Sequence, residues 1–144
     1  MPTVNDYALT RLGPQRFEEL SQALALRLLG PSVQIFGDGP DGGREASFEN
    51  LSSFPSPAAP WTGYGVLQAK FRKRPQDAAS NTKWLVGQMV AELEEWVNPA
   101  SKRVRNGRVP DYLLVTTNVV LSPAPGAGGI DRVQAALWER AHTL

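Results

Sequence analysis

The side chains that could do chemistry lie in two short segments of the 144-residue chain. Acidic residues lie in or just after a glycine-rich turn, and a glutamine and a lysine follow in an apolar run: Asp38, Asp41, Glu45, Gln68 and Lys70. If the two segments pair as neighbouring strands, a carboxylate of the first meets an amide and an ammonium of the second. Mg²⁺ prefers oxygen ligands, usually one or two carboxylates with waters. These residue types therefore fit the hydrolysis of a phosphodiester bond.

The Gln-x-Lys pair offers further parts that such a hydrolysis needs. The side chain of Gln68 and the backbone carbonyl of Ala69 can supply oxygen atoms to a cation. The ammonium of Lys70 can orient the attacking water or stabilise the negative charge that develops on the phosphate. On a half-exposed strand such a pair is more often simply solvated, so its meaning depends on its surroundings.

Composition excludes several other chemistries. The chain has no cysteine and a single histidine, His142, near its end. A thiol nucleophile, a disulfide framework and a Cys/His zinc site are therefore excluded, and a histidine-based triad would depend on His142 alone. Fifteen basic and 14 acidic residues give a net charge of +1, which is typical of an ordinary globular domain. Carboxylates, amides, lysines and arginines remain for catalysis.

A helix is predicted to precede both segments. Gly13-Pro14 marks its start and Gly30-Pro31 its end, and Glu18 and Glu19 are expected in its first turn. The apolar residues at helical spacing, which we expect to form the buried face, are Phe17, Leu20, Leu24 and Leu28.

Extended segments are predicted next. Residues 33–36 and 44–48 flank the glycine-rich turn and predict a hairpin or two short strands. Residues 52–60 hold three prolines and predict a surface loop. Residues 61–71 predict a strand, with the glutamine and the lysine of the pair on one face.

The second half of the chain predicts helix, strand and helix. The second helix begins at a cap, Asp77 or Ser80, and ends near Asn98-Pro99. Residues 112–121 are almost continuously apolar and predict a strand buried on both faces. The last helix begins near Ile130-Asp131. The residues that we expect to face the core in these two helices are Leu85, Met89, Leu93, Trp96, Val133, Leu137 and Ala141. The predicted order is α-β-β-β-α-β-α, an α/β sandwich in which helices flank a central mixed sheet.

Three motifs, in this order, resemble those of a known nuclease family. They are Phe17-Glu18, Asp41-Gly42-Gly43-Arg44-Glu45 and Val66-Leu67-Gln68-Ala69-Lys70. An acidic residue followed at a variable distance by Gln-x-Lys at the end of an apolar strand resembles the PD-(D/E)xK nuclease superfamily, and specifically its Mrr-like restriction endonuclease branch. The resemblance covers residues 10–121 in order. The chain departs from that branch in two ways. Glu45 stands where the motif Asp-Gly-Gly-x-Asp has its last aspartate, and a proline-rich insertion precedes Gln68.

This resemblance implies a restriction-endonuclease-like fold that cleaves DNA phosphodiester bonds with Mg²⁺ or Mn²⁺. The site residues that it implies are Glu18, Asp41, Glu45, Gln68 and Lys70, with the backbone carbonyl of Ala69 as a further metal ligand. Glu45, Gln68 and Asp41 would hold the metal, and Lys70 would position or activate the water. We favour Glu45 over Asp41 as the principal ligand, because Glu45 lies in the strand whereas Asp41 is explained as a turn residue.

Two basic runs lie beside these motifs. If the chain is a nuclease, they are contacts for phosphates, which raise affinity without reading the base sequence. Otherwise they are solvated loops. Their residues are Arg72, Lys73, Arg74, Lys102, Arg103 and Arg105.

A narrower resemblance is to the nuclease-like domains at the N-termini of bacterial STAND or NACHT-type NTPases that act in antiphage defence. Residues 42–46, 68–71, 110–119 and 128–131 carry it. It implies that residues 1–144 are a single effector domain of a longer protein with C-terminal NTPase and sensor domains. DNA is then the expected substrate, and a homo-oligomer is the expected active form.

Two other functions stay open. One is a catalytically inactive nuclease-like module for DNA binding or oligomerisation, and the other is an RNase on the same fold. No apolar run approaches the length of a membrane span, and the N-terminus has no signal-peptide pattern. We therefore expect no membrane partner and a cytoplasmic location.

Overall fold

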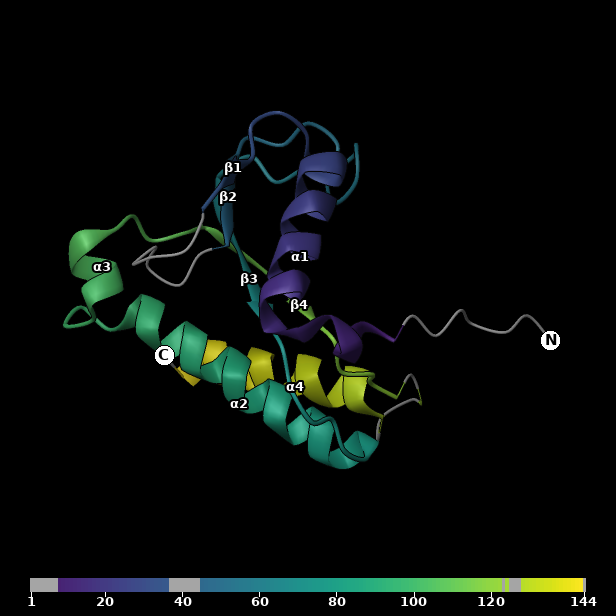
Figure 1. The fold of residues 1–144 in the computed structure, drawn as a ribbon. Coiled ribbons are helices and arrows are strands. Elements are labelled where there is room, and N and C mark those ends of the chain that lie inside the picture. Colours follow the sequence, from purple (N-terminus) through teal and green to yellow (C-terminus); the bar gives the residue numbers. More distant parts are fainter. Residues whose placement is uncertain (1–7, 37–44, 123, 125–127, 144) are drawn as a thin grey trace.

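Four strands form one mixed sheet in the computed structural model, which describes residues 8–36, 45–122, 124 and 128–143 (Figure 1). Their order in the sheet follows the sequence: β1 (Gln34–Ile35), β2 (Ala46–Glu49), β3 (Tyr64–Lys70) and β4 (Tyr112–Thr117). β2 is antiparallel to both β1 and β3, whereas β3 and β4 are parallel. A parallel pair needs a long crossover, which the chain makes through helices. The predicted α/β class with a mixed sheet is therefore confirmed.

Helices flank this sheet. They are the 3₁₀ turn η1 (Leu9–Leu12), α1 (Gly13–Leu29), α2 (Ala78–Val97), α3 (Lys102–Asn106) and α4 (Gly129–Thr143). α1 packs on one face, α2 packs on the other, and α4 lies alongside α2 (Figure 1). The order matches the predicted one, with η1 and α3 added. No helix in the described part of the chain combines the length and the apolar character needed to cross a membrane.

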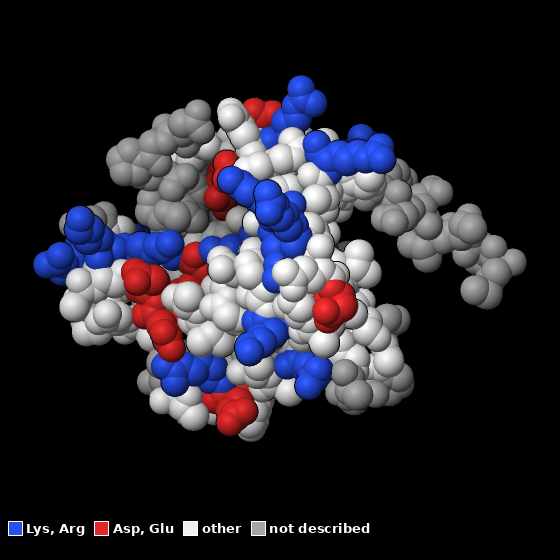
Figure 2. All heavy atoms as spheres, turned by 60° about the horizontal axis from the view of Figure 1, so that its bottom comes forward, with Lys and Arg blue, Asp and Glu red and all other residues white. Residues whose placement is uncertain are grey.

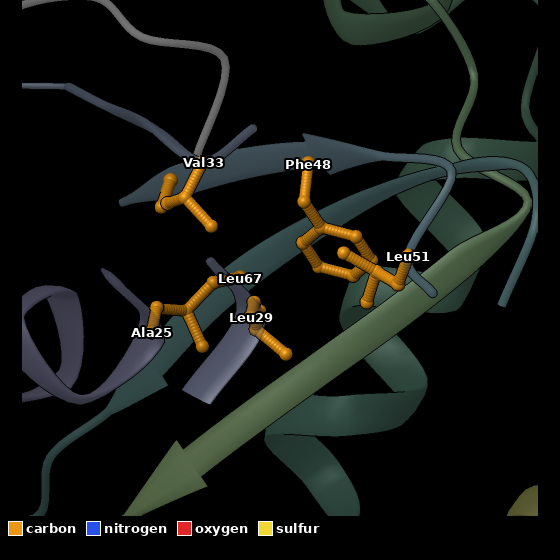
Figure 3. Close-up of a cluster of buried hydrophobic side chains, with 7 residues drawn as sticks. Ala25, Leu29, Val33, Phe48, Leu51 and Leu67 are labelled. Carbon is orange, nitrogen blue, oxygen red and sulfur yellow. The ribbon is translucent and has the colours of Figure 1, made fainter. Parts of the chain in front are cut away.

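Apolar side chains from α1, β2 and β3 meet on one face of the sheet (Figure 3). The buried members of this cluster are Ala25, Leu29, Val33, Ala46, Phe48, Leu51 and Leu67. The ring of Phe48 lies directly over Gly65 of β3, where an added Cβ would be 2.2 Å from a ring carbon. Gly65 is therefore required by the close approach of the Phe48 ring.

The opposite face of β3 turns toward α2. Val66 is completely buried there and packs against Trp96 of α2. Since successive side chains of a strand point to opposite faces, Gln68 and Lys70 share this face with Val66. The predicted alternation is confirmed in β3, which covers Tyr64–Lys70 of the predicted residues 61–71, and it places the Gln-x-Lys pair under α2.

The buried face of α1 includes Phe17, as predicted, but otherwise differs from the predicted one. Leu24 and Leu28 are 45% and 64% exposed. The residues that are buried are Phe17, Ser21, Ala25 and Leu29. Small side chains at positions 21 and 25 let the helix backbone approach the sheet, where Ser21 Oγ lies 2.8 Å from Thr116 Oγ1. This close contact turns the larger leucines outward.

β4 is shorter and less buried than predicted. It ends at Thr117, short of its predicted end, and every residue in it is only half-buried. Asn118 follows, and its side chain accepts a hydrogen bond from the Arg72 amide (2.8 Å) and donates one to the Arg72 carbonyl (2.9 Å). Within the described residues β4 pairs with β3 alone, so it is an edge strand. The prediction of burial on both faces is therefore wrong.

α2 and α4 pack as a pair. Of the two predicted caps, Asp77 is the one that begins α2, since its Oδ1 accepts from the Ser80 amide at 2.9 Å. Leu85 of α2 and Val133 of α4 are buried in one cluster, as their spacing predicts. Ala141 is exposed, because the burial of α4 is confined to its first half, and its predicted inward position is wrong.

Candidate functional site

Glu45 meets the Gln-x-Lys pair where the start of β2 and the end of β3 lie side by side. The two strands are antiparallel. The Glu45 amide donates to the Leu67 carbonyl at 2.9 Å, and the Glu45 carboxylate accepts from the Ala69 amide at 2.7 Å through Oε2. The carboxylate therefore lies at the Gln68–Ala69 peptide, within the Gln-x-Lys segment, as the pairing of the two segments predicts.

A side chain of α1 is hydrogen-bonded to the backbone of Glu45. The side-chain nitrogen of Gln22 donates to the backbone oxygens of Glu45 (2.9 Å) and Phe36 (2.7 Å). Glu18 precedes Gln22 by one helical turn, so the two share one side of α1. The first turn of α1 holds no acidic residue, and the predicted first-turn position of Glu18 and Glu19 is therefore wrong. Half-buried Glu18 instead lies one turn before Gln22, the residue that hydrogen-bonds the backbone oxygen of Glu45.

A buried glutamate of α2 holds both side chains of the pair. Glu92 is 6% exposed, and its Oε2 accepts from Nε2 of Gln68 at 2.6 Å. The same carboxylate forms ion pairs with the ammonium of Lys70 and the guanidinium of Arg103. Gln68, Lys70 and Arg103 come from β3 and α3, so this cluster joins three elements around one carboxylate.

Sequence reasoning missed Glu92, although one signal could have found it. Glu92 lies seven residues after Leu85 and four before Trp96, which places it on the same side of α2 as these two buried residues. A glutamate at such a position is rarely buried unless it is paired. The pattern thus predicts cationic partners beneath α2.

The partners of Glu92 keep it ionised. Burial by itself raises the pKa of a carboxyl group. Here hydrogen bonds from Arg103, Lys70 and Gln68, together with the positive charge of Lys70, outweigh burial and lower the pKa of Glu92 below its ordinary value. The side chain therefore acts only as a hydrogen-bond acceptor.

The stability of the protein is expected to follow the charge of Glu92. Since the pKa of Glu92 is lower in the folded than in the unfolded state, its contribution is fully present above the unfolded-state pKa and is lost as the pH falls through the folded-state pKa. The free energy of unfolding, measured with urea, should decrease more on acidification for the wild type than for Glu92→Gln. Equal decreases in the two proteins would contradict the lowered pKa.

The oxygen atoms at the start of β2 and the end of β3 are of the types that bind a divalent cation. Glu45 offers a carboxylate, Ala69 a backbone carbonyl and Gln68 a side-chain amide. Because the amide nitrogen of Gln68 donates to Glu92, the amide oxygen is the end turned away from that carboxylate. One carboxylate, two carbonyl oxygens and waters are ligands that Mg²⁺ and Mn²⁺ accept. The residues present therefore fit the predicted metal.

Asp38 and Asp41, in the glycine-rich turn, lie outside the described residues. Among the residues that the structure does describe, no group of three Asp, Glu, His or Cys side chains could hold a metal ion. Glu45 is thus the carboxylate of the predicted metal-binding set whose position is known.

Of the predicted phosphate contacts, two are engaged within the protein. The Arg72 guanidinium donates to Asn81 Oδ1 at 2.8 Å, and the Arg103 guanidinium pairs with Glu92. The four with exposed side chains are Lys73, Arg74, Lys102 and Arg105. Figure 2 shows Lys and Arg side chains spread over the α2 side of the molecule with acidic side chains among them. Positive and negative side chains are thus mixed on this face, in a chain whose net charge is +1.

No family model, no curated protein and no solved structure matches the chain. The contacts around Glu45, Gln68 and Lys70 are therefore the ground for assigning a function.

Proposed function

We propose that this chain is a metal-dependent endonuclease domain of the PD-(D/E)xK superfamily, of the Mrr-like branch, and that it hydrolyses DNA phosphodiester bonds. The observation that carries the proposal is the contact of the Glu45 carboxylate with the Ala69 amide, at 2.7 Å, between Gln68 and Lys70. A carboxylate, an amide and an ammonium from two adjacent strands are the parts that such a hydrolysis needs. The restriction-endonuclease-like sandwich is the specific fold that belongs to this proposal.

In this function Mg²⁺ or Mn²⁺, when bound, neutralises charge on the phosphate and makes water a better nucleophile. Glu45, the amide oxygen of Gln68 and the carbonyl of Ala69 hold the cation, with Asp41 as an additional acid. The ammonium of Lys70 positions the attacking water and stabilises negative charge on the phosphate. Glu18 adds a carboxylate on the side of α1 that carries Gln22, and Gln22 is hydrogen-bonded to the backbone oxygen of Glu45.

The larger assembly is part of the same proposal. The domain would be the N-terminal effector of a longer antiphage or restriction protein, with C-terminal NTPase and sensor domains, and would act in the cytoplasm. Cutting both DNA strands needs two sites, so a homo-oligomer would be the active form. The exposed side chains of Lys73, Arg74, Lys102 and Arg105 would contact phosphates.

The test is cleavage of a supercoiled plasmid at high protein concentration with Mg²⁺, with Mn²⁺ or with EDTA. The proposal expects nicked and linear DNA with either metal and intact plasmid with EDTA. A structured RNA incubated in parallel separates a DNase from an RNase. Cleavage that persists in EDTA, or a protein that binds neither metal in calorimetry, would contradict a metal-dependent nuclease.

One observation favours a second candidate, a nuclease-like module without catalytic activity. The ammonium of Lys70 is paired with a buried carboxylate, Glu92, that is itself paired with Arg103. Such an ion-pair cluster can serve the fold alone. DNA binding without cleavage, together with no calorimetric response to either metal, would identify this module.

A further inference from the structure

We propose that Glu92 is a positioning residue: its buried carboxylate fixes the Lys70 ammonium and the orientation of the Gln68 amide at the end of β3. The role of these two side chains in DNA hydrolysis rests on the proposed function. Their placement by Glu92 rests on the contacts alone.

The first part of the argument concerns Lys70. A lysine ammonium sits on a flexible four-carbon chain and has no preferred direction of its own. The side chain of Lys70 is nevertheless only 15% exposed, and its ammonium pairs with Glu92, whose side chain is 7% exposed. A buried charge pair restricts the ammonium far more than water would. Glu92 thus places the positive charge at one point beneath α2.

The second part concerns Gln68. The oxygen and nitrogen ends of an amide have nearly the same shape, so packing alone does not decide which end points where. The oxygens of Glu92 already accept from the two cations Lys70 and Arg103, so a donor group must face them, and the nitrogen of Gln68 lies 2.6 Å from Oε2. The oxygen then has to point away from Glu92. A glutamine at position 92 could donate as well as accept, and would remove this constraint while keeping the shape.

The third part concerns Arg103. Two cations, Lys70 and Arg103, face the single carboxylate of Glu92, so the cluster carries a surplus of positive charge next to Gln68. Arg103 also lies over the ring of Trp96, 5.5 Å from its centroid. Arg103 therefore fixes the position of the Glu92 carboxylate from α3, while Lys70 and Gln68 contact the same carboxylate from β3.

The experiment compares the wild type with Glu92→Gln by NMR of the lysine ammonium and glutamine amide groups. The chain has only four lysines, and the other three, Lys73, Lys83 and Lys102, are exposed. We expect one ammonium signal that is protected from exchange with water and that is absent from Lys70→Arg. In Glu92→Gln this signal should move to the position of the exposed lysines, and the side-chain amide signals of Gln68 should shift.

The same pair of proteins is then compared in plasmid cleavage. We expect kcat to fall about 10–100-fold in Glu92→Gln with KM for DNA unchanged, as for groups that orient metal ligands. Glu94→Gln is the matched control, since Glu94 lies on the same helix in an exposed pair with Arg140, and it should leave kcat unchanged. Glu92→Asp keeps the charge on a shorter side chain, and a partial recovery of kcat would separate positioning from a structural role.

Two results would overturn the proposal. One is a Lys70 ammonium that exchanges with water as fast as the exposed lysines do in the wild type. This result comes from the wild type alone and does not depend on whether a variant folds. The other is an active wild type whose kcat is unchanged by Glu92→Gln. A wild type that cleaves no nucleic acid with either metal would instead refute the proposed function, and the Lys70 and Gln68 signals would still decide whether Glu92 positions them.

Discussion

Glu45→Gln is expected to reduce metal-dependent DNA cleavage about 100-fold or more and to leave the fold intact. Glutamine keeps an oxygen that can accept the hydrogen bond from the Ala69 amide, which the native carboxylate accepts at 2.7 Å. It removes the negative charge that a divalent cation needs. Losing about 3 kcal/mol of charge stabilisation in the transition state corresponds to roughly a 100-fold loss of rate.

The measurement is the initial rate of plasmid nicking at saturating Mg²⁺, with metal affinity determined by calorimetry. Glu49→Gln is the matched control, because Glu49 lies at the other end of β2 and its carboxylate is paired with Arg108 on the surface. Glu49→Gln should retain the activity and the metal affinity of the wild type. If Glu45→Gln cleaves and binds metal as well as the wild type does, Glu45 is not the metal ligand and the proposed site fails.

Glu92→Ala is expected to lower the free energy of unfolding by about 3–5 kcal/mol, the usual effect of removing one partner of a buried ion pair. The reason is that Lys70 and Arg103, only 15% and 22% exposed in their side chains, would remain as two neighbouring cations with no carboxylate between them. The hydrogen bond of the Gln68 amide would also be lost. Urea denaturation followed by circular dichroism measures the change as a lower midpoint at an unchanged slope.

Glu94→Ala provides the comparison on the same helix. Glu94 also forms an ion pair, with Arg140, but the two side chains are 47% and 39% exposed. Exposed pairs contribute little, so this variant should lose less than about 1 kcal/mol. A loss for Glu92→Ala as small as that for Glu94→Ala would show that the cluster beneath α2 does not stabilise the fold.

The elements themselves followed from local patterns. α2 ends at Val97, directly before Asn98-Pro99, because a proline disfavours the helical conformation of the residue that precedes it. The alternation of Val66, Leu67 and Gln68 between the two faces of β3 is likewise a property of any strand. These features depend on neighbouring residues, and the sequence order therefore predicts them.

The buried side of α1 was not predictable in the same way. Hydrophobic spacing favours Leu24 and Leu28, yet both are exposed. The helix instead approaches the sheet through Ser21, whose hydroxyl contacts Thr116 on β4. Which side of a helix is buried depends on the surface that it meets, and that surface is built by residues far away in the chain.

The sequence by itself determined the α/β class, and it predicted a carboxylate beside the Gln-x-Lys pair on the condition that the two segments form neighbouring strands. Only the tertiary structure decided the partners of that pair. Glu92 is 24 residues from Gln68 and 11 from Arg103, and it reaches both because α2 folds back across β3. Burying the Glu92 carboxylate without partners would destabilise the folded state, so the packing of α2 on the sheet and the formation of this cluster depend on each other.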